Sequence, residues 1–507
     1  RYFFLNSFSS VVLLVAKSIV GIWFTKFLID NLSLAIYGLV PLAVAMTNYM
    51  SVVMTALNYA VGRYFTIDLR SGNLHTAVRT FNTALWGTIL AVLFLAPFAF
   101  GFSYASPRIF DVPLGFELDA QMLFGLVMGA YLLSIVRSIF SLSSFATNRL
   151  DLQNWGLLLD LAVRIGIPIL LFQLFAPSLW QVGLGAFVGA VLSFGLAVWV
   201  WRWLTPAVVI DLRAFEAKRL RPLMSTGGWI VLSQAGNLLL LNVDLIIVNL
   251  ILGAEAGGQY GSVLQWSLLL RTIAIAMSAV LKPTALDLYA RGQMVQLHQM
   301  VTQAVKLFGL FLALPVGGLM VYAAPLLTVW LGDSFASLSW LLACLVVHLA
   351  VNMSVLSLFH LQVTLNKVRW MGIGTAVAGV ANVILGVWWT NWLGMIGLAL
   401  AGLVVFSVRN AILTPIYSAY IMQRPWYIYL KPLSSIVIAT GLATILAMLS
   451  ALFVMPNSWI TLILNGTVVA IVYTIIVYIF MLNRVDRDLI MQFNPFAHMY
   501  TKVKHTS

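Results

Sequence analysis

Residues 242–261 read NVDLIIVNLILGAEAGGQYG, and this stretch decides the fold of the chain. Its apolar run carries one acidic residue, Asp244, and ends at Gly253. After a short polar turn, a second apolar run starts with Tyr260 and Gly261. A membrane helix needs about 20 mostly apolar residues to cross the hydrocarbon core, and each run extends that far. We therefore predict a hairpin of two membrane-spanning helices with an acid at membrane depth.

The whole chain has the same character. Hydrophobic residues make up 62% of its 507 residues, charged residues only 8%, and the mean hydropathy is +0.99. Charged residues are about a quarter of a soluble domain, so a soluble globular protein is excluded. The net charge of +13 is spread over short loops and helices, without the dense basic stripe or aromatic platform of a nucleic-acid-binding surface. The composition predicts an all-α polytopic membrane protein that binds no nucleic acid.

Fourteen stretches are long and apolar enough to cross a membrane. Their approximate ranges are 2–29, 33–62, 80–103, 119–143, 155–176, 180–203, 226–252, 257–282, 302–324, 336–360, 369–391, 393–420, 429–454 and 457–482. The first is too long for a cleavable signal peptide and lacks its small-residue pattern. The longest polar connections are 63–79, 204–225 and 283–301. Prolines interrupt several spans, among them Pro415, and predict kinks.

The distribution of Lys and Arg predicts the orientation. Of the 28 basic residues, twenty-one lie between spans on one side, Arg108 lies alone on the other, and six lie within spans. Loops rich in Lys and Arg face the cytoplasm. We therefore expect both termini to be cytoplasmic, because the number of spans is even.

The first hairpin repeats the pattern of the seventh and eighth spans. Residues 28–38, LIDNLSLAIYG, align without gaps on residues 251–261 at an offset of 223, so that Tyr37-Gly38 falls on Tyr260-Gly261. An even number of spans per repeat predicts parallel lobes around a central cleft. The predicted parts are an N-lobe at 1–203, a cytoplasmic amphipathic linker at 204–225, a C-lobe at 226–420, two added spans within 429–482, and a cytoplasmic tail at 483–507.

These two hairpins resemble the multidrug/oligosaccharidyl-lipid/polysaccharide flippase superfamily, and within it the polysaccharide transporter family of lipid-linked oligosaccharide flippases. That family typically has an Asp in the span, then Leu-Gly, an acid and Tyr-Gly, which match Asp244, Leu252-Gly253, Glu255 and Tyr260-Gly261. The first hairpin departs from the pattern, with Ile29-Asp30 where Leu-Gly is usual. The resemblance implies two six-helix lobes around a cavity that opens alternately to either side of the bacterial inner membrane.

Six cations and two acids lie at membrane depth, a formal excess of four positive charges. The cations are Lys17, Lys26, Arg137, Arg164, Arg271 and Arg409, and the acids are Asp160 and Asp244. A charge at the bilayer centre costs about 3 kcal/mol, so these residues need partners, water or a function. The superfamily carries undecaprenyl-pyrophosphate-linked sugars, the lipid-linked peptidoglycan precursor, and organic cations. A positive cleft favours the anionic diphosphates.

Arg271 and Lys17 are the leading candidates for substrate binding. A guanidinium offers a planar fork of donors that fits phosphate oxygens. For Arg271, an ion pair with Asp244 is an alternative that can coexist with phosphate binding, as a gate. Lys17 sits in the middle of the first span, where its alternative is hydrogen-bonded packing. Lys26, nine residues on, points to the opposite helix face and can reach the outer surface, so it is a weaker candidate.

The remaining charged residues have roles that the sequence predicts less narrowly. Arg137 and Arg409 either line an inward-facing vestibule or reach toward cytoplasmic headgroups. The i, i+4 spacing of Asp160 and Arg164 predicts an ion pair on one helix face. For coupling to an ion gradient, Asp244 is the first candidate and Asp160 the second, with H⁺ and Na⁺ both open.

Three uncharged features complete the prediction. Gln234, Asn237, Asn242 and Asn249 make the seventh span polar, which suits either sugar hydroxyls or interhelical hydrogen bonds. His348 and His360 are expected to be hydrogen-bonded helix residues, without a metal site. The single cysteine, Cys344, is expected to be a packed apolar side chain.

The predicted function is flipping of an undecaprenyl-pyrophosphate-linked oligosaccharide for cell-surface polysaccharide biosynthesis, with no catalytic residues and no cofactor. Alternatives are a flippase for the lipid-linked peptidoglycan precursor and a multidrug or cation antiporter. A membrane polymerase or ligase ranks last, because the largest outer connection, about 104–118, has little room for a catalytic site. Expected partners are membrane lipids, a polysaccharide polymerase and glycosyltransferases, and the chain is expected to be a monomer.

Overall fold

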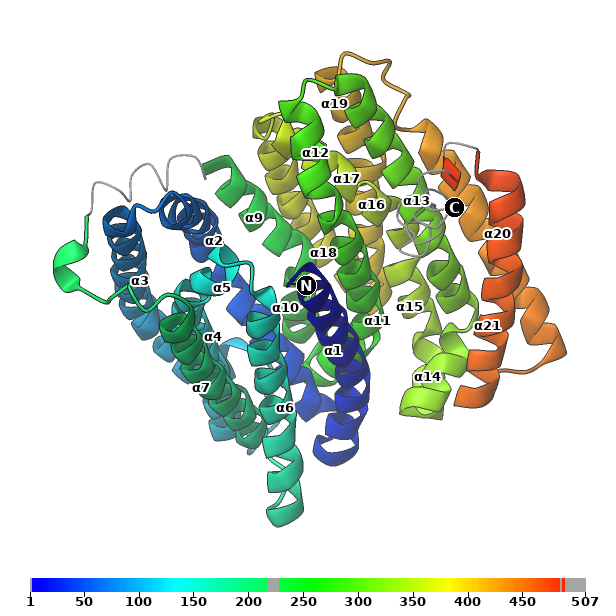
Figure 1. Ribbon diagram of the computed structural model, residues 1–507. Helices are drawn as coiled ribbons and strands as arrows, with labels where there is room; N and C mark the ends of the chain where they lie inside the picture. Colours follow the sequence, from blue (N-terminus) through cyan, green and yellow to red (C-terminus); the bar gives the residue numbers. More distant parts are fainter. Residues whose placement is uncertain (1, 217–227, 484–485, 488–507) are drawn as a thin grey trace, which may run out of the picture. The chain divides into compact units, whose positions relative to one another are not determined.

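A computed structural model describes residues 2–216, 228–483 and 486–487. The chain divides into two compact units, coloured along the sequence in Figure 1. Unit 1 comprises Arg1–Gln265 and Gly372–Leu398, and unit 2 comprises Trp266–Met371 and Ala399–Ser507. Part of the predicted linker (217–225) and most of the predicted tail (483–507) lie outside the described residues.

Every regular element within the described residues is a helix, as the composition predicted. Unit 1 holds α1 (Tyr2–Leu32), α2 (Leu34–Arg70), α3 (Leu74–Ile109), α4 (Glu117–Phe140), α5 (Leu142–Ala146), α6 (Leu150–Leu174), α7 (Leu179–Leu204), η1 (Leu212–Ala214), α9 (Gly228–Leu241), α10 (Val243–Leu252), the first part of α11 (Ala254–Ala279) and the middle part of α18 (Arg369–Ser407).

Unit 2 holds the remaining parts of α11 and α18 together with shorter elements. These are α12 (Leu281–Ala290), α13 (Met294–Val321), α14 (Ala323–Leu331), η2 (Asp333–Leu338), α15 (Ser339–Val346), α16 (Leu349–Ser354), α17 (Leu356–Thr364), η3 (Val408–Leu413), α19 (Thr414–Ile421), α20 (Lys431–Phe453), α21 (Trp459–Ile476) and η4 (Val477–Met481).

Among the described residues, 12 helical stretches are long and apolar enough to cross a membrane. One of them, Arg369–Ile421, contains two predicted spans, because Gly394 adopts non-helical angles (φ 60°, ψ −144°) within α18. The apolar start of α2, Leu34–Met50, supplies the predicted second span. The predicted set of fourteen spans is therefore present, and the protein is an all-α, multi-pass membrane protein.

Two of the predicted polar connections are mostly helical. Within 63–79, α2 continues to Arg70 and α3 begins at Leu74. Within 283–301, α12 continues to Ala290 and α13 begins at Met294. Gly72 and Gly292 make the two tight turns at φ 77° and 71°. Hydropathy marks where the apolar part of a span ends, whereas backbone hydrogen bonding extends the helix beyond it.

In unit 1, small residues let α7 pack closely against its neighbours. A Cβ at Gly185 would lie 2.7 Å from the carbonyl oxygen of Arg164, and one at Gly189 would lie 2.8 Å from that of Asp160. Glycine at these positions removes the side chain that would separate the helices. The backbone of α6 is therefore held tightly at the level of Asp160 and Arg164.

The described part of the predicted linker is bound to α3. The Asn82 side chain, which is fully buried, donates to the carbonyl of Val209 at 2.8 Å and accepts from the backbone N–H of Asp211 at 2.8 Å. Arg79 and Glu216 form an ion pair of 2.5 Å. Residues 209–216 thus have a fixed position on unit 1.

The two hairpins that suggested a repeat pack directly on each other. A Cβ at Gly38 would lie 2.6 Å from the backbone nitrogen of Gly258, and one at Gly258 would clash with the carbonyl of Leu34. One at Gly261 would lie 2.9 Å from Pro41. These contacts pair α2 with α11 at an offset of 220 residues, and the same offset relates the positive-φ residues Ser33 (72°) and Gly253 (92°).

The structural correspondence therefore differs by three residues from the gapless alignment at 223. The two Tyr-Gly pairs are alike in sequence but are not equivalent positions in the structure. The equivalent positions are defined by the turn of each hairpin and by the crossing of α2 and α11. Ser33 occupies the turn position that a glycine takes in the second hairpin, which explains the missing Leu-Gly in the first copy.

The loop after α3 fastens the turn of the second hairpin in unit 1. The carboxylate of Asp111 accepts from the backbone N–H of Ala254 at 2.8 Å. Asn249, 2% exposed, accepts from the Asp111 N–H at 3.0 Å and donates to its carbonyl at 3.2 Å. Asn249 thus connects the seventh span to the loop after α3, and the role of the other polar residues of this span stays a prediction.

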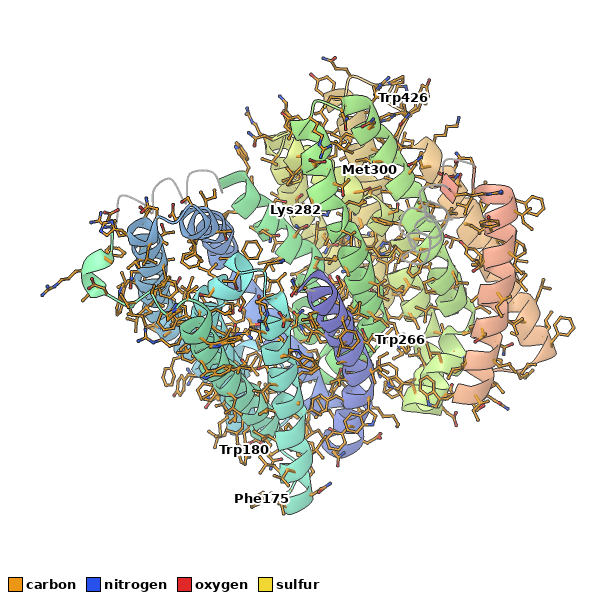
Figure 2. The ribbon with its side chains drawn as sticks, in the orientation of Figure 1. Phe175, Trp180, Trp266, Lys282, Met300 and Trp426 are labelled. Atoms are coloured by element: carbon orange, nitrogen blue, oxygen red, sulfur yellow. The ribbon has the colours of Figure 1, made fainter. Side chains whose placement is uncertain are left out.

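In unit 2, α13 packs against α20 and α21. A Cβ at Gly317 would lie 2.7 Å from the Ala443 side chain, and the Tyr473 hydroxyl donates to the Leu310 carbonyl at 2.6 Å. Lys306 on α13 pairs with Asp486 at 2.6 Å. Figure 2 places Trp426 near one end of the unit 2 helices and Trp266 nearer the other.

Candidate functional site

The eight charged residues predicted at membrane depth fall into both units. Unit 1 contains six of them, and unit 2 contains Arg271 and Arg409. Four of the six come from three helices far apart in the sequence, and only the packing of α1, α4 and α6 brings them together.

In unit 1, two further cations lie within electrostatic range of an Asp160–Arg164 ion pair. Arg164 donates to Asp160 at 3.2 Å, with side chains 37% and 17% exposed. Lys17 on α1 interacts electrostatically with Asp160, Arg164 and Arg137. Arg137 on α4 interacts with the same acid and with Arg164. We call Lys17, Arg137, Asp160 and Arg164 the unit 1 cluster; its formal charge is +2.

The predicted Asp160–Arg164 ion pair is present, but it is part of a larger arrangement. Sequence spacing identifies partners on one helix, whereas Lys17 and Arg137 come from other helices. Lys17 is exposed, so the cluster keeps an accessible ammonium beside a half-buried ion pair. Such a group of donors suits an anion with several oxygens.

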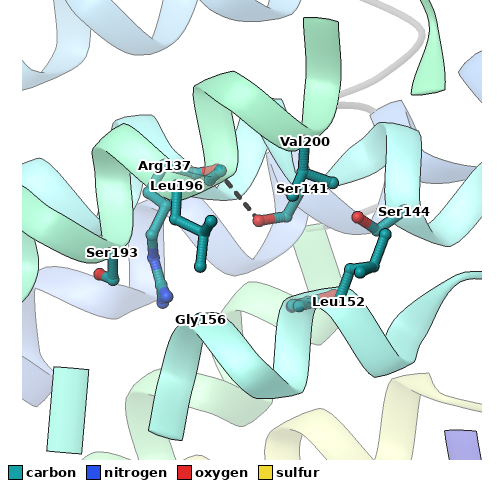
Figure 3. A pocket seen from close by; sticks show the side chains of 10 residues that line it. Arg137, Ser141, Ser144, Leu152, Gly156, Ser193, Leu196 and Val200 are labelled. Atoms are coloured by element: carbon teal, nitrogen blue, oxygen red, sulfur yellow. Dashed lines mark hydrogen bonds between the residues drawn. The ribbon is translucent and has the colours of Figure 1, made fainter. Parts of the chain in front are cut away.

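A small pocket lies beside Arg137. Figure 3 shows the Arg137 side chain reaching from α4 toward Gly156 on α6, with Ser141, Ser144 and Ser193 around the pocket. Its volume is about 10 Å³, which is room for about one water molecule. The pocket is therefore a place for water next to the guanidinium, far too small for a saccharide.

Lys26 has a partner on its own helix. Its Nζ lies 3.1 Å from the Asp30 carboxylate, and the two side chains are 42% and 53% exposed. This position near the end of α1 agrees with a side chain that reaches the surface. Contact between Lys26 and a substrate stays a prediction.

Asp244 lies in a polar group of unit 1. Its carboxylate accepts from the Tyr260 hydroxyl at 3.0 Å, and the residue is 8% exposed. Asn242, between α9 and α10, accepts from the Asn48 side chain at 2.7 Å. Asp244 stands in the first turn of α10, where a helix N-terminus stabilises a negative charge. Its role in ion coupling stays a prediction.

In unit 2, Arg271 on α11 lies over an aromatic ring. Its Cζ is 5.2 Å from the centre of the Phe406 ring, within the range of a cation–π interaction. His348 stacks on the same ring with centroids 5.7 Å apart and planes at 17°. Arg271 and His348 are each 8% exposed. The predicted gate between Arg271 and Asp244 joins residues of different units and stays a prediction.

Arg409 in η3 has a similar environment. Its Cζ lies 4.7 Å from the centre of the Phe359 ring, its Nη1 donates to the Asn410 side chain at 3.2 Å, and it is 8% exposed. We call Arg271, Arg409, Phe406 and Phe359 the unit 2 cluster. Whether Arg409 lines a vestibule or reaches toward headgroups stays a prediction.

The two histidines hydrogen-bond, as predicted. His348 Nδ1 lies 2.9 Å from the Asn352 amide nitrogen, and His360 lies 3.4 Å from the Ser278 hydroxyl. In the described part of the chain no three His, Cys, Asp or Glu residues are grouped as metal ligands.

Sequence reasoning missed the aromatic and amide partners of the unit 2 cluster. Phe359, Phe406 and Asn352 sit in a strongly apolar chain with 30 phenylalanines, where a single ring gives no signal. Asn410, next to Arg409, was the one partner visible from adjacency.

The fold is that of transporters of the MOP superfamily. The lipid II flippase MurJ in an inward closed conformation matches with a TM-score of 0.67 at 16% identity, over 96% of this chain and 100% of that chain. An inward-facing multidrug resistance MATE family transporter of the MOP superfamily matches with a TM-score of 0.62 at 13% identity, over 81% and 98%.

Sequence comparison gives the family. Residues 5–288 match the family described as polysaccharide biosynthesis protein. The uncharacterized membrane protein EpsK of Bacillus subtilis (strain 168) is 30% identical over 499 residues, which is 97% of each chain. This chain therefore belongs to the polysaccharide biosynthesis protein family, as the two hairpins predicted.

Proposed function

We propose that this protein flips an undecaprenyl-pyrophosphate-linked oligosaccharide from the cytoplasmic to the outer leaflet of the bacterial inner membrane. The lipid tail stays in the bilayer, while a positive surface shelters the diphosphate and sugars during alternating access. Membership of a polysaccharide biosynthesis family and a MOP transporter fold support this proposal. The observation that carries it is a set of membrane-depth cations, three of them near Asp160 in unit 1 and two on aromatic rings in unit 2.

The proposed topology follows from the basic residues. Both termini are cytoplasmic, two six-helix lobes at 1–203 and 226–420 flank the cargo, and the spans within 429–482 are additions. The substrate-binding residues are Lys17, Arg271, Arg137, Arg409 and Arg164, with Lys26 as the weakest member. Asp244 is the first candidate for coupling to H⁺ or Na⁺, and Asp160 is the second.

A second candidate cargo is the lipid-linked peptidoglycan precursor, because the fold matches a lipid II flippase over nearly the whole chain. Both cargoes carry the same anionic group, so the clusters fit either. A competition experiment separates them: only the true cargo should compete efficiently for flipping at equal concentration. Organic cations fit poorly beside an excess of positive charge, and no catalytic role is proposed.

The test is flipping in proteoliposomes. A fluorescent undecaprenyl-diphosphate saccharide is added to one leaflet, and the fraction exposed to an impermeant quencher is followed with time. We expect Arg271→Ala or Lys17→Ala to abolish flipping while the protein still folds. The matched control is Arg291→Ala, which removes an exposed arginine paired with Asp287 at 3.0 Å outside the clusters.

Two results would count against the proposal in different ways. Normal flipping by both cluster variants would refute the site. No flipping of any diphosphate-linked saccharide by the folded wild-type protein would refute the function, and chemical conversion of the lipid-linked sugar would instead identify an enzyme.

A further inference from the structure

The twelfth span contains a widened helical turn at Arg409. Residues Val408–Leu413 form a π-helix, η3, immediately before Thr414 and Pro415. Proline has no N–H, and its ring would clash with the carbonyl four residues earlier, that of Ala411. Widening the preceding turn relieves that clash. Single π turns within α-helices often occur at functional sites.

The widened turn holds the backbone of Arg409 from both directions. The N–H of Thr414 bonds to the Arg409 carbonyl, five residues back, and the Thr414 hydroxyl donates to the same carbonyl at 2.9 Å. An ordinary α-helix would pair Thr414 with Asn410 instead. The direction of the Arg409 side chain therefore depends on the π turn.

A chain of neutral contacts connects Arg409 to Arg271. Asn410 accepts from Arg409 and donates to the carbonyl of Asn352 at 3.1 Å. Asn352, fully buried, donates from its amide to His348 Nδ1 at 2.9 Å, which leaves the proton of neutral His348 on Nε2. The His348 ring stacks on Phe406, the ring beneath Arg271.

We propose that Asn410 and Asn352 are positioning residues and that the π turn before Pro415 aims Arg409, so that Arg271 and Arg409 bind the two phosphates of one diphosphate. This inference rests on the proposed function and adds a specificity: two arginines held in register recognise a diphosphate lipid better than a monophosphate lipid. Asn410 touches Arg409 and acts on the anion through it.

The test is a double-mutant cycle in proteoliposomes with Asn410→Ala, Arg409→Gln and the double variant. Flipping is measured with undecaprenyl diphosphate-linked and monophosphate-linked versions of one fluorescent sugar. We expect Asn410→Ala to raise KM for the diphosphate lipid about tenfold, the effect of one charge-assisted hydrogen bond, with kcat and the monophosphate lipid nearly unchanged. In the Arg409→Gln background, Asn410→Ala should add nothing.

Pro415→Ala tests the backbone separately. It restores the N–H, so the turn can close to an α-helix, and it should reduce the preference for diphosphate as Asn410→Ala does. The control is Asn465→Ala, a buried asparagine of α21 that donates to the Val454 carbonyl at 2.8 Å; it should leave the preference unchanged.

Additive effects of Asn410→Ala and Arg409→Gln, or equal losses on both lipids, would overturn the inference. These outcomes differ from failure of the proposed function, which appears as the absence of diphosphate-lipid flipping in the wild-type protein. Asn410→Gln keeps the amide and should restore part of the lost affinity. If Asn410→Ala does not fold, a double-mutant cycle of Pro415→Ala, Arg409→Gln and their double variant tests the same inference.

Discussion

In unit 1, Asp160 pairs with Arg164 and attracts Lys17 and Arg137, whereas in unit 2 Arg271 and Arg409 each lie over an aromatic ring and Arg409 also donates to a side-chain amide. A carboxylate attracts strongly and also cancels charge. Aromatic faces and amides hold an arginine with weaker, directional forces and leave its charge intact. The stability of the unit 1 cluster therefore depends on the charge of Asp160. The unit 2 cluster depends on the positions of its aromatic rings and amide.

This difference between the clusters predicts how each should respond to mutation. Removing the shared acid of the unit 1 cluster leaves like charges facing one another. Adding an acid to the unit 2 cluster would place a carboxylate where Arg409 now donates to a side-chain amide. Four substitutions test this contrast, in order of decreasing expected effect.

Asp160→Asn should have the largest effect on folding. It leaves Arg164 without its ion-pair partner and removes the acid that attracts Lys17 and Arg137, so we expect a loss of about 2 kcal/mol in the free energy of unfolding, less than for a fully buried pair because Arg164 is 37% exposed. Unfolding by denaturant in detergent micelles measures it. A loss below about 0.5 kcal/mol would mean that water already screens the cluster and that the contrast with unit 2 is wrong.

Asn410→Asp should give unit 2 the character of unit 1. It is nearly isosteric and places a carboxylate 3.2 Å from Arg409 Nη1, where the amide oxygen now lies. We expect flipping of the diphosphate lipid to fall about thirtyfold, or about 2 kcal/mol in transition-state stabilisation, because the arginine is neutralised. Initial flipping rates in proteoliposomes measure this; unchanged rates would show that Arg409 does not meet the anion.

Phe406→Leu should have an intermediate effect. It removes the ring that faces both Arg271 and His348 and leaves an apolar side chain, at a cost of about 1 kcal/mol from the cation–π interaction. The effect should appear mainly as weaker binding of the diphosphate lipid, measured by flipping at varied lipid content. Phe453→Leu, which changes a highly exposed ring (87%) at the end of α20, is the control.

Asp30→Asn should have the smallest effect and serves as the matched partner of Asp160→Asn. Both acids belong to i, i+4 ion pairs, but Asp30 and Lys26 are about half exposed. An exposed pair contributes about 0.5 kcal/mol or less. A large loss of stability or of flipping would instead indicate that Lys26 belongs to the substrate site.

The candidate site was only partly predictable. The six membrane-depth cations were visible because charges are rare in apolar spans, and the Asp160–Arg164 pair was visible because both residues share one helix. Lys17 and Arg137 meet that pair only after three helices pack. Phe406 and Phe359 carry no charge, so nothing in the sequence distinguished them from other apolar residues.

The repeat shows the same limit in the backbone. Similarity of residues placed Tyr37-Gly38 on Tyr260-Gly261, but the crossing of Gly38 with Gly258 sets an offset of 220. Similar residues show that the two hairpins have similar composition. Which residue of one hairpin corresponds to which residue of the other depends on where their backbones approach closely.

The sequence by itself determined the all-α membrane fold, the spans and the family, because hydropathy and turn-forming residues act locally along the chain. It also predicted a kink at Pro415, since a missing N–H disturbs any helix, and a widened turn precedes this proline. Tertiary structure alone decided which cations share an acid and which lie on aromatic rings, because those contacts depend on the rotation and packing of helices far apart in the sequence.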